Sequence, residues 1–310
     1  MEEFARVTVD LLKKRIKNPQ AELRNKTVGV NLVKKGDRIM SVTSEKDLQK
    51  RYDFARDLAR RVGLDALRYW KQQGVEGLGT QSKGLQDFVT KADKAAEDTI
   101  RSELNQMFPA DGFIGEETGG LPGSAGYWVV DPIDGTANYM RGLRHWGISI
   151  AYVCDGKTQL GIVHDAPTDR VYHARVDHGA FCDEQPIRVS STDDPHTATG
   201  ILGMSRRILI DSYLNQIRAL YDAGIEYRRI GSAAIGIIRV AEGVADFYYE
   251  GHLNCWDALA AVLIAQEAGG TAVVPPMNRF IADGGEVFCS TPALSGQLIG
   301  LLPPTTSASI

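Results

Sequence analysis

The sequence lacks the patterns that mark several common enzyme classes. Its six histidines form no HxxxH or HExxH pair, which argues against a zinc hydrolase. It contains no Gly-x-Ser-x-Gly, no GxGxxG after a predicted strand and no GxxxxGK[ST] loop. These absences argue against a serine hydrolase, a dinucleotide-binding enzyme and a P-loop NTPase. The four cysteines form no CxxC pair, so we expect reduced, buried thiols rather than a zinc site or a disulfide framework.

The sequence also lacks an excess of positive charge and a long apolar run. Its formal net charge is −4, so we do not expect nucleic acid as the primary partner. No apolar run is long enough to span a membrane, and the start Met1-Glu2-Glu3 does not resemble a signal peptide. We therefore expect a cytoplasmic protein without membrane association.

The chain is long enough to bury a sizeable core. Its 310 residues are 43% hydrophobic and 24% charged, which is typical of a folded globular protein and compatible with two domains or one large layered domain. Residues 1–44 contain the basic clusters Lys13-Lys14-Arg15 and Lys34-Lys35 and end in a Ser/Thr-rich break. We expect an appendage over residues 1–44, a main domain over 45–302 and a flexible tail over 303–310.

Apolar spacing and capping residues predict the elements of the main domain. Ser44 caps a helix over residues 45–73, and Thr90 caps a helix that runs to about Phe108. The glycine-rich stretch that follows, residues 112–120, predicts a loop. Further helices are expected over 205–221, 233–241 and 256–267, and strands over 127–130, 147–153, 160–164, 171–176, 199–202 and 225–229. This order favours a mixed α/β protein with layered sheets and helices over a doubly wound parallel sheet.

Acidic residues stand at structural transitions in four separate segments, which are Asp93, Glu116-Glu117, Asp131 with Asp134, and Asp257. Hard divalent cations prefer oxygen ligands, and carboxylates from different segments assemble such sites. The four segments therefore predict a site for divalent metal ions.

The central segment is Asp131-Pro132-Ile133-Asp134-Gly135-Thr136, directly after an apolar strand. Two carboxylates leave the strand end together, and Gly135 allows close approach of the backbone to an anion such as phosphate. The alternative is an Asp-Pro turn followed by an Asp-Gly turn, which is common in loops.

The other acids also have structural alternatives. Glu116 and Glu117 could form a solvated charge pair, and Asp93 completes a capping box with Thr90. Asp257 could simply cap the helix that begins near Trp256.

Four ordered motifs resemble the inositol monophosphatase family. They are Asp87-Phe88-Val89-Thr90-Lys91-Ala92-Asp93, Gly115-Glu116-Glu117, Asp131 to Tyr139, and Trp256-Asp257 with Glu267-Ala268-Gly269-Gly270. The resemblance covers about residues 45–302, and four motifs in order are more specific than any one of them. It implies a five-layer α/β/α/β/α sugar-phosphatase fold, a homodimer, about two or three Mg²⁺ ions and inhibition by Li⁺.

The resemblance also implies a role for each residue of the motifs. The metal ligands would be Glu116, Asp131, the Ile133 carbonyl, Asp134 and Asp257. Asp93 and Thr136 would orient or deprotonate the attacking water, and Glu117 would support its loop. The amides of Gly135 and Thr136 would hold phosphate.

The substrate side of the family also has matches in this sequence. Gly231-Ser232-Ala233 resembles a substrate-binding segment, and Glu250 resembles the acid that receives sugar hydroxyls; the alternative for Glu250 is a solvated acid at a strand end. Ala137 replaces a threonine common in the family, and Arg141 and Arg144 follow it, so these departures bear on the substrate rather than on the chemistry.

We therefore predict hydrolysis of a small phosphorylated polyol, first of all inositol-1-phosphate, by metal-activated water without a phosphoenzyme. Histidinol phosphate is the next candidate, followed by 3′-phosphoadenosine nucleotides and fructose bisphosphate. A different class is a non-catalytic regulatory or binding protein on the same fold. This alternative is suggested by the basic appendage. There, Leu12-Lys13-Lys14-Arg15-Ile16, followed by Asn18-Pro19 and Val30 to Val33, weakly resembles the end of a LacI-type effector domain.

Overall fold

The computed structural model describes residues 32–34, 39–41, 44–84, 87–123, 126–302 and 305. The chain forms two compact units, Met1–Val42 and Thr43–Ile310. In the first unit, strands β1 (Leu32–Lys34) and β2 (Ile39–Ser41) pair in antiparallel fashion. The remainder of the predicted appendage, and the predicted tail apart from Thr305, lie outside the described residues.

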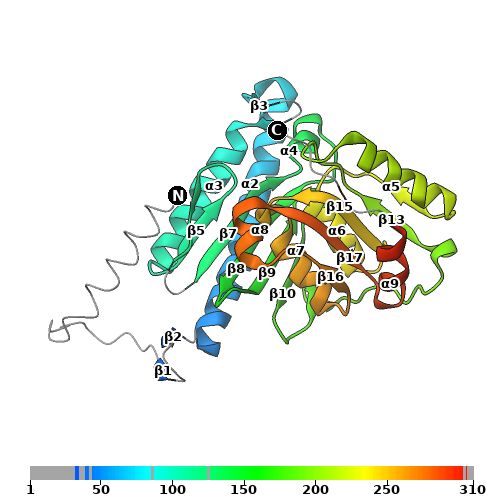
Figure 1. Ribbon diagram of the computed structural model, residues 1–310. Helices are drawn as coiled ribbons and strands as arrows, with labels where there is room; N and C mark the ends of the chain where they lie inside the picture. Colours follow the sequence, from blue (N-terminus) through cyan, green and yellow to red (C-terminus); the bar gives the residue numbers. More distant parts are fainter. Residues whose placement is uncertain are drawn as a thin grey trace, which may run out of the picture. The chain divides into compact units, whose positions relative to one another are not determined.

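The second unit contains two large sheets (Figure 1). The first has eight strands in the order β12-β11-β10-β9-β8-β7-β5-β6, and only the pair β5 and β7 is parallel. These strands are β5 (Gly112–Gly115), β6 (Gly119–Leu121), β7 (Tyr127–Asp134), β8 (Gly147–Cys154), β9 (Lys157–Asp165), β10 (Arg170–Arg175), β11 (Ala180–Cys182) and β12 (Gln185–Pro186).

The second sheet is mixed and has the order β14-β13-β15-β17-β16. Its strands are β13 (Thr199–Leu202), β14 (Glu226–Arg228), β15 (Phe247–Leu253), β16 (Thr271–Val273) and β17 (Gly285–Ser290). A small ribbon pairs β3 (Gln81–Gly84) with β4 (Asp87–Val89), and β4 is the beginning of the first motif.

Helices cover and separate the two sheets in five layers. The helices are α2 (Glu45–Gly77), α3 (Lys91–Met107), α4 (Thr136–Arg141), α5 (Ile210–Asp222), α6 (Ala233–Ala241), α7 (Cys255–Glu267), α8 (Met277–Asp283) and α9 (Pro292–Leu301), with a 3₁₀ helix at Pro195–Thr197. One apolar core joins α2 and α3 to the eight-stranded sheet, a second joins both sheets to α6 and α7, and a third joins the five-stranded sheet to α5 and α9 (Figure 1). The layers thus follow the order α/β/α/β/α, which confirms the predicted fold.

The long helix α2 begins and ends where local chemistry dictates. The Ser44 side chain accepts a hydrogen bond from the Asp47 amide at 3.1 Å, which satisfies one of the free N–H groups of the first turn. Gly74 has φ 62° and ψ −176°, outside helical values. The regular helix therefore ends near residue 73, as its apolar spacing predicts, although the assigned helix continues to Gly77.

Two predictions of secondary structure are wrong. The glycine-rich stretch predicted as a loop forms the hairpin of β5 and β6, with Phe113 and Ile114 buried. A Cβ at Gly120 would lie 1.9 Å from the Phe113 carbonyl oxygen, so glycine permits the close pairing that ordinary turn statistics do not anticipate. Helix α5 begins at Ile210 rather than at residue 205.

No helix among the described residues is both long and apolar enough to cross a membrane.

Candidate active site

Strand β7 delivers two carboxylates to one end of the eight-stranded sheet. Its pairing with β8 changes register between Asp131 and Asp134, so the strand is irregular where these acids stand. Asp131 is 2% exposed and Asp134 6% exposed. The Ile133 amide donates to Asp131 Oδ1 at 3.0 Å, which fixes the turn around Pro132.

Asp134 reaches the N-terminus of helix α6. The Ala234 amide donates to Asp134 Oδ2 at 2.7 Å and the Ala233 amide to Oδ1 at 3.3 Å. The Ser232 hydroxyl also donates to Asp134, and it accepts from the Ile235 amide as the cap of α6. These donors and the helix dipole favour the charged carboxylate. Asp134, which the sequence predicts as a metal ligand, therefore connects the eight-stranded sheet to helix α6.

Asp93 and Asp257 occupy the first turns of α3 and α7. The Thr90 amide donates to Asp93 Oδ2 at 2.8 Å, and the Asn254 amide donates to Asp257 Oδ2 at 2.8 Å. Thr136 Oγ1 also donates to Asp93, to Oδ1 at 2.9 Å. The predicted caps are present, and Asp93 additionally contacts the central segment.

Glu97 is a buried acid of this region that sequence reasoning does not single out. It is 0% exposed, and it accepts hydrogen bonds from the Glu117 amide at 2.8 Å and the Thr118 amide at 3.0 Å. A Cβ at Gly115 would lie 2.4 Å from Glu97 Oε2, so the glycine of this motif makes room for the acid. Glu97 follows Asp93 by four residues and shares the face of Ile100, and an acid on the apolar face of a helix is the signal that could reveal it.

The acids act strongly on one another. Burial raises the pKa values of Asp131 and Asp257 well above the ordinary value, and the nearby charges of Glu116 and Asp134 raise both further. Burial also raises the pKa of Asp134 to about 6, although its bonds to Ser232 and the α6 amides act in the opposite direction. Carboxylates from three segments thus share one poorly hydrated region.

This donor set fits a hard divalent cation. Asp131 and Glu116 are hydrogen-bonded to each other, and two carboxylates in such contact need a proton or a cation between them. All the converging groups offer oxygen, which suits Mg²⁺. In the part of the chain that the structure describes, no three His, Cys, Asp or Glu side chains surround a common point closely enough to hold an ion as they stand. The structure therefore shows the acids gathered without showing a coordination geometry.

A cavity of about 690 Å³ opens beside these acids. Its lining includes Asp134, Asp257 and Glu250. Glu250 is 8% exposed and accepts a hydrogen bond from the Tyr248 hydroxyl at 2.6 Å, so the alternative of a solvated strand-end acid is wrong. Burial and the Asp134 charge raise the pKa of Glu250 to about 7, while Arg229 acts to lower it.

The substrate segment divides into two parts. Gly231 is exposed and lines the cavity, whereas the Ser232 hydroxyl and the Ala233 amide are bonded to Asp134. The Asn138 side chain donates to the carbonyls of His145 at 2.6 Å and Ile230 at 2.7 Å, which ties the central motif to this segment. Ala137 lines the cavity, while Arg141 and Arg144 are exposed and are not among its lining residues.

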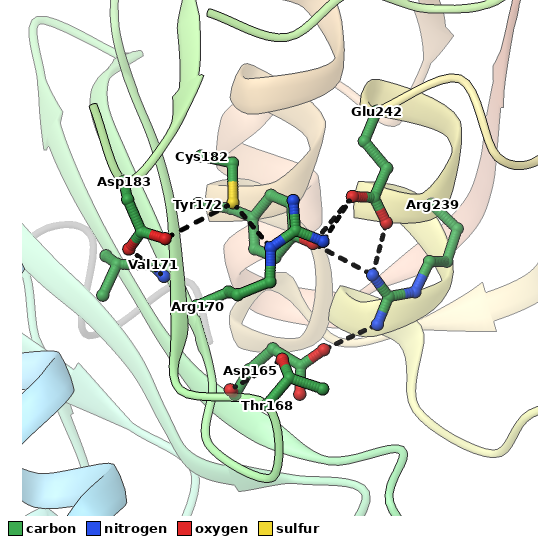
Figure 2. Close-up of polar contacts among 9 residues, drawn as sticks. All are labelled: Asp165, Thr168, Arg170, Val171, Tyr172, Cys182, Asp183, Arg239 and Glu242. Carbon is green, nitrogen blue, oxygen red and sulfur yellow. Dashed lines mark hydrogen bonds and ion pairs between the residues drawn. The ribbon is translucent and has the colours of Figure 1, made fainter. Parts of the chain in front are cut away.

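A second polar cluster anchors the other end of α6. Figure 2 shows Arg239 between Glu242 and Asp165, with Tyr172 and Arg170 beside them. Arg239 donates to Asp165 Oδ2 at 2.6 Å and to the Tyr172 hydroxyl at 3.0 Å, and Tyr172 donates to Glu242 Oε2 at 2.7 Å. The helix whose N-terminus holds Asp134 is thereby fixed to strands β9 and β10.

The layered fold and the gathered carboxylates are typical of metal-dependent hydrolases of phosphate esters. The model of the inositol monophosphatase family matches residues 47–305. The chain is 32% identical to inositol-1-monophosphatase from Rhizobium meliloti, over 72% of this chain and 86% of that protein. It is also 35% identical to Nus factor SuhB from Haemophilus influenzae, over 81% of this chain and 94% of that protein.

Solved structures agree with these matches. Extragenic suppressor protein suhB from Bartonella henselae superposes with a TM-score of 0.75 at 28% identity, covering 83% of this chain and 97% of that one. An IMPase from Thermotoga maritima gives a TM-score of 0.73 at 30% identity, covering 82% and 96%. The chain belongs to the inositol monophosphatase family of phosphatases.

Proposed function

We propose that this chain is a Mg²⁺-dependent phosphomonoesterase that hydrolyses a small phosphorylated polyol, with inositol-1-phosphate as the first candidate. The observation that supports it is the gathering of Glu116, Asp131, Asp134 and Asp257 from three segments, with Asp134 and Asp257 lining one cavity. Burying carboxylates that repel one another raises the free energy of the folded protein, and bound cations offset this destabilisation.

Glu116, Asp131, the Ile133 carbonyl, Asp134 and Asp257 would hold the magnesium ions. Bound Mg²⁺ supplies an acidified water and neutralises the negative charge that develops on the phosphate oxygens. The α6 amides and Ser232 keep the Asp134 carboxylate in a fixed orientation, and the Asn254 amide does the same for Asp257.

Asp93 and Thr136 form the proton-handling pair of the proposal. Thr136 Oγ1 lies 2.9 Å from Asp93 Oδ1, so this hydroxyl can pass its proton to Asp93 while it accepts one from the attacking water. Burial raises the pKa of Asp93, which makes its carboxylate a better proton acceptor than an exposed aspartate. The water oxygen then attacks phosphorus directly, the bond from phosphorus to the polyol oxygen breaks, and the polyol leaves after its oxygen takes up a proton, so no phosphoenzyme forms.

The substrate contacts of the proposal come from three parts of the chain, two of which, at Gly231 and Glu250, line the cavity. The amides of Gly135 and Thr136 would hold the phosphate, and Gly231 and Glu250 would contact the polyol. Ser232 and Ala233 act on the substrate indirectly, by orienting Asp134, because both are already hydrogen-bonded to that carboxylate. The backbone amide of Glu117 donates a hydrogen bond to the Glu97 carboxylate, and this bond supports the loop that contains Glu117.

The test is Mg²⁺-dependent phosphate release from inositol-1-phosphate, histidinol phosphate, adenosine 3′,5′-bisphosphate and fructose bisphosphate. We expect release from at least one compound and loss of at least about a hundredfold in kcat for Asp134→Asn, with weaker Mg²⁺ binding. Wild-type turnover in Asp134→Asn would contradict the assigned site. We also propose that the enzyme is a cytoplasmic homodimer inhibited by Li⁺, which light scattering and a Li⁺ titration of activity will check.

A second candidate is a non-catalytic binding role on the same fold. It is favoured by relatives that carry the name Nus factor SuhB, among them the protein from Haemophilus influenzae. The presence of acids in all four segments favours the enzyme, because a protein that only binds a partner has no need for mutually repelling buried carboxylates.

A further inference from the structure

Two arginines line the same cavity as the acidic residues. Arg206 follows strand β13, and Arg229 follows strand β14, so they come from neighbouring strand ends of the second sheet. Asp134 and Asp257 line the same cavity of about 690 Å³. The cavity therefore presents guanidinium groups in addition to the region assigned to metal ions.

These two arginines differ from their sequence neighbours. Arg207 donates to Asn254 Oδ1 at 2.7 Å, and Arg228 pairs with Glu226 at 2.9 Å. Among the described residues, neither Arg206 nor Arg229 forms a hydrogen bond or an ion pair with a carboxylate. Both side chains are exposed at the cavity, so their donors are available to a ligand.

Glu250 lines the same cavity as Asp134 and Arg229. Its carboxyl interacts electrostatically with both Asp134 and Arg229, so the arginine acts on the same region as a predicted metal ligand. A Cβ at Gly203 would lie 2.0 Å from Glu250 Oε2, so the glycine lets this acid pack closely against β13. A substrate with its reacting phosphate at Asp134 would occupy the cavity that the guanidinium groups also line.

We propose that Arg206 and Arg229 bind a second phosphate where the substrate carries one, so that a bisphosphate is hydrolysed more efficiently than the corresponding monophosphate. This inference rests on the proposed function. Guanidinium groups bind phosphate through paired, charge-assisted hydrogen bonds. They repel a cationic leaving group, which counts against histidinol phosphate.

The experiment compares matched substrates that differ by one phosphate. It measures kcat/KM for adenosine 3′,5′-bisphosphate against adenosine 3′-monophosphate, and for inositol 1,4-bisphosphate against inositol 1-phosphate. We expect wild type to favour the bisphosphate of each pair by roughly tenfold or more, and Arg206→Gln and Arg229→Gln each to remove most of that preference. The monophosphates should be hydrolysed at nearly the wild-type rate by both variants.

Arg228→Gln is the matched control, because it removes the same charge from an adjacent residue that is paired with Glu226. It should keep the bisphosphate preference. The preference should also decrease as salt is raised, since the arginines are exposed. Equal treatment of mono- and bisphosphates by wild type, or an unchanged preference in both arginine variants, would overturn the inference and leave the proposed phosphatase intact.

A calorimetric titration with adenosine 3′,5′-bisphosphate separates the two proposals. Arginine-dependent binding without release of phosphate from any compound would contradict the phosphatase and support the second phosphate site. Absence of both binding and release would overturn both proposals.

Discussion

At the scale of single residues, Glu97 shows how a buried acid can serve a site without belonging to a recognised motif. Its two oxygens accept from the amides of Glu117 and Thr118, and Arg101 lies 3.3 Å from Oε1. The loop that presents Glu116 is therefore held from helix α3. An acid in this position is a positioning residue, because its contacts are with the loop.

We predict that Glu97→Gln weakens Mg²⁺ binding and lowers kcat/KM for phosphate release by about ten- to a hundredfold while the protein stays folded. The amide of glutamine places an N–H group against loop amides that need an acceptor. The measurement is a Mg²⁺ titration of activity beside a circular dichroism spectrum. Glu103→Gln on the same helix is the control, because Glu103 pairs with Arg61 away from the loop. Equal Mg²⁺ dependence in both variants would contradict this role.

A second residue-scale prediction concerns His173, which is 2% exposed and held as a neutral ring. Tyr52 bonds to its Nδ1, and its Nε2 lies 2.7 Å from the Asp183 carbonyl oxygen, to which it donates. Burial lowers the pKa of His173 to about 4, so between pH 6.5 and 4 the unfolded chain binds a proton that the folded chain does not. The stabilisation that comes from the neutral His173 ring is fully present above pH 6.5. The free energy of unfolding then falls as the pH drops from 6.5 to 4.

The loss should reach about 3 kcal/mol by pH 4, and urea unfolding at a series of pH values will measure it. His173→Gln should show a shallower decrease between pH 6.5 and 4 than wild type. If both proteins lose stability with the same slope, His173 does not carry the pH dependence.

At the scale of elements, helix α6 joins the two halves of the site. Its N-terminus binds Asp134 of the eight-stranded sheet, and its last turns bind Asp165 and Glu242 through Arg239. Ile235, Ile237 and Ile238 are fully buried between the sheets. The position of a predicted metal ligand therefore depends on the packing of a helix far from it in sequence.

We predict that Arg239→Met destabilises the protein by roughly 3–5 kcal/mol, because it leaves the buried Asp165 carboxylate without its cation. The measurement is urea or thermal unfolding at neutral pH. Arg218→Met on the exposed face of α5 is the control and should change stability by less than about 0.5 kcal/mol. Similar effects of the two substitutions would show that the cluster in Figure 2 does not anchor the helix.

At the scale of the whole molecule, the residues of the site all belong to the unit Thr43–Ile310, and the family match begins at residue 47. We predict that removing residues 1–42 leaves phosphate release within about twofold of the full chain, because Ser44 remains to cap α2. Steady-state kinetics of both proteins will measure it. Removal of residues 1–44 serves as the comparison for the cap and should cost about 1 kcal/mol in stability. A loss of turnover in the shorter deletion would assign the N-terminal residues a part in the reaction.

The sequence alone determines much of this protein. Local periodicity and caps predict α2, α3, α6 and α7 closely, since amphipathic spacing and capping residues act over a few neighbours. The order of the four acidic motifs is sufficient to indicate the family, and the family fixes the five-layer fold.

The tertiary structure decides what depends on contacts between distant segments. The hairpin of β5 and β6 escapes prediction because its glycines are required by close packing, which leaves no local strand pattern. Three other features also depend on contacts between distant segments. Glu97 is buried against the Glu117 loop, and Asp134 accepts hydrogen bonds from the N-terminus of a helix about a hundred residues later. The third feature is the pair of arginines that line the same cavity as Glu250. Each of these contacts depends on how the sheets and helices stack, and no stretch of neighbouring residues determines that stacking.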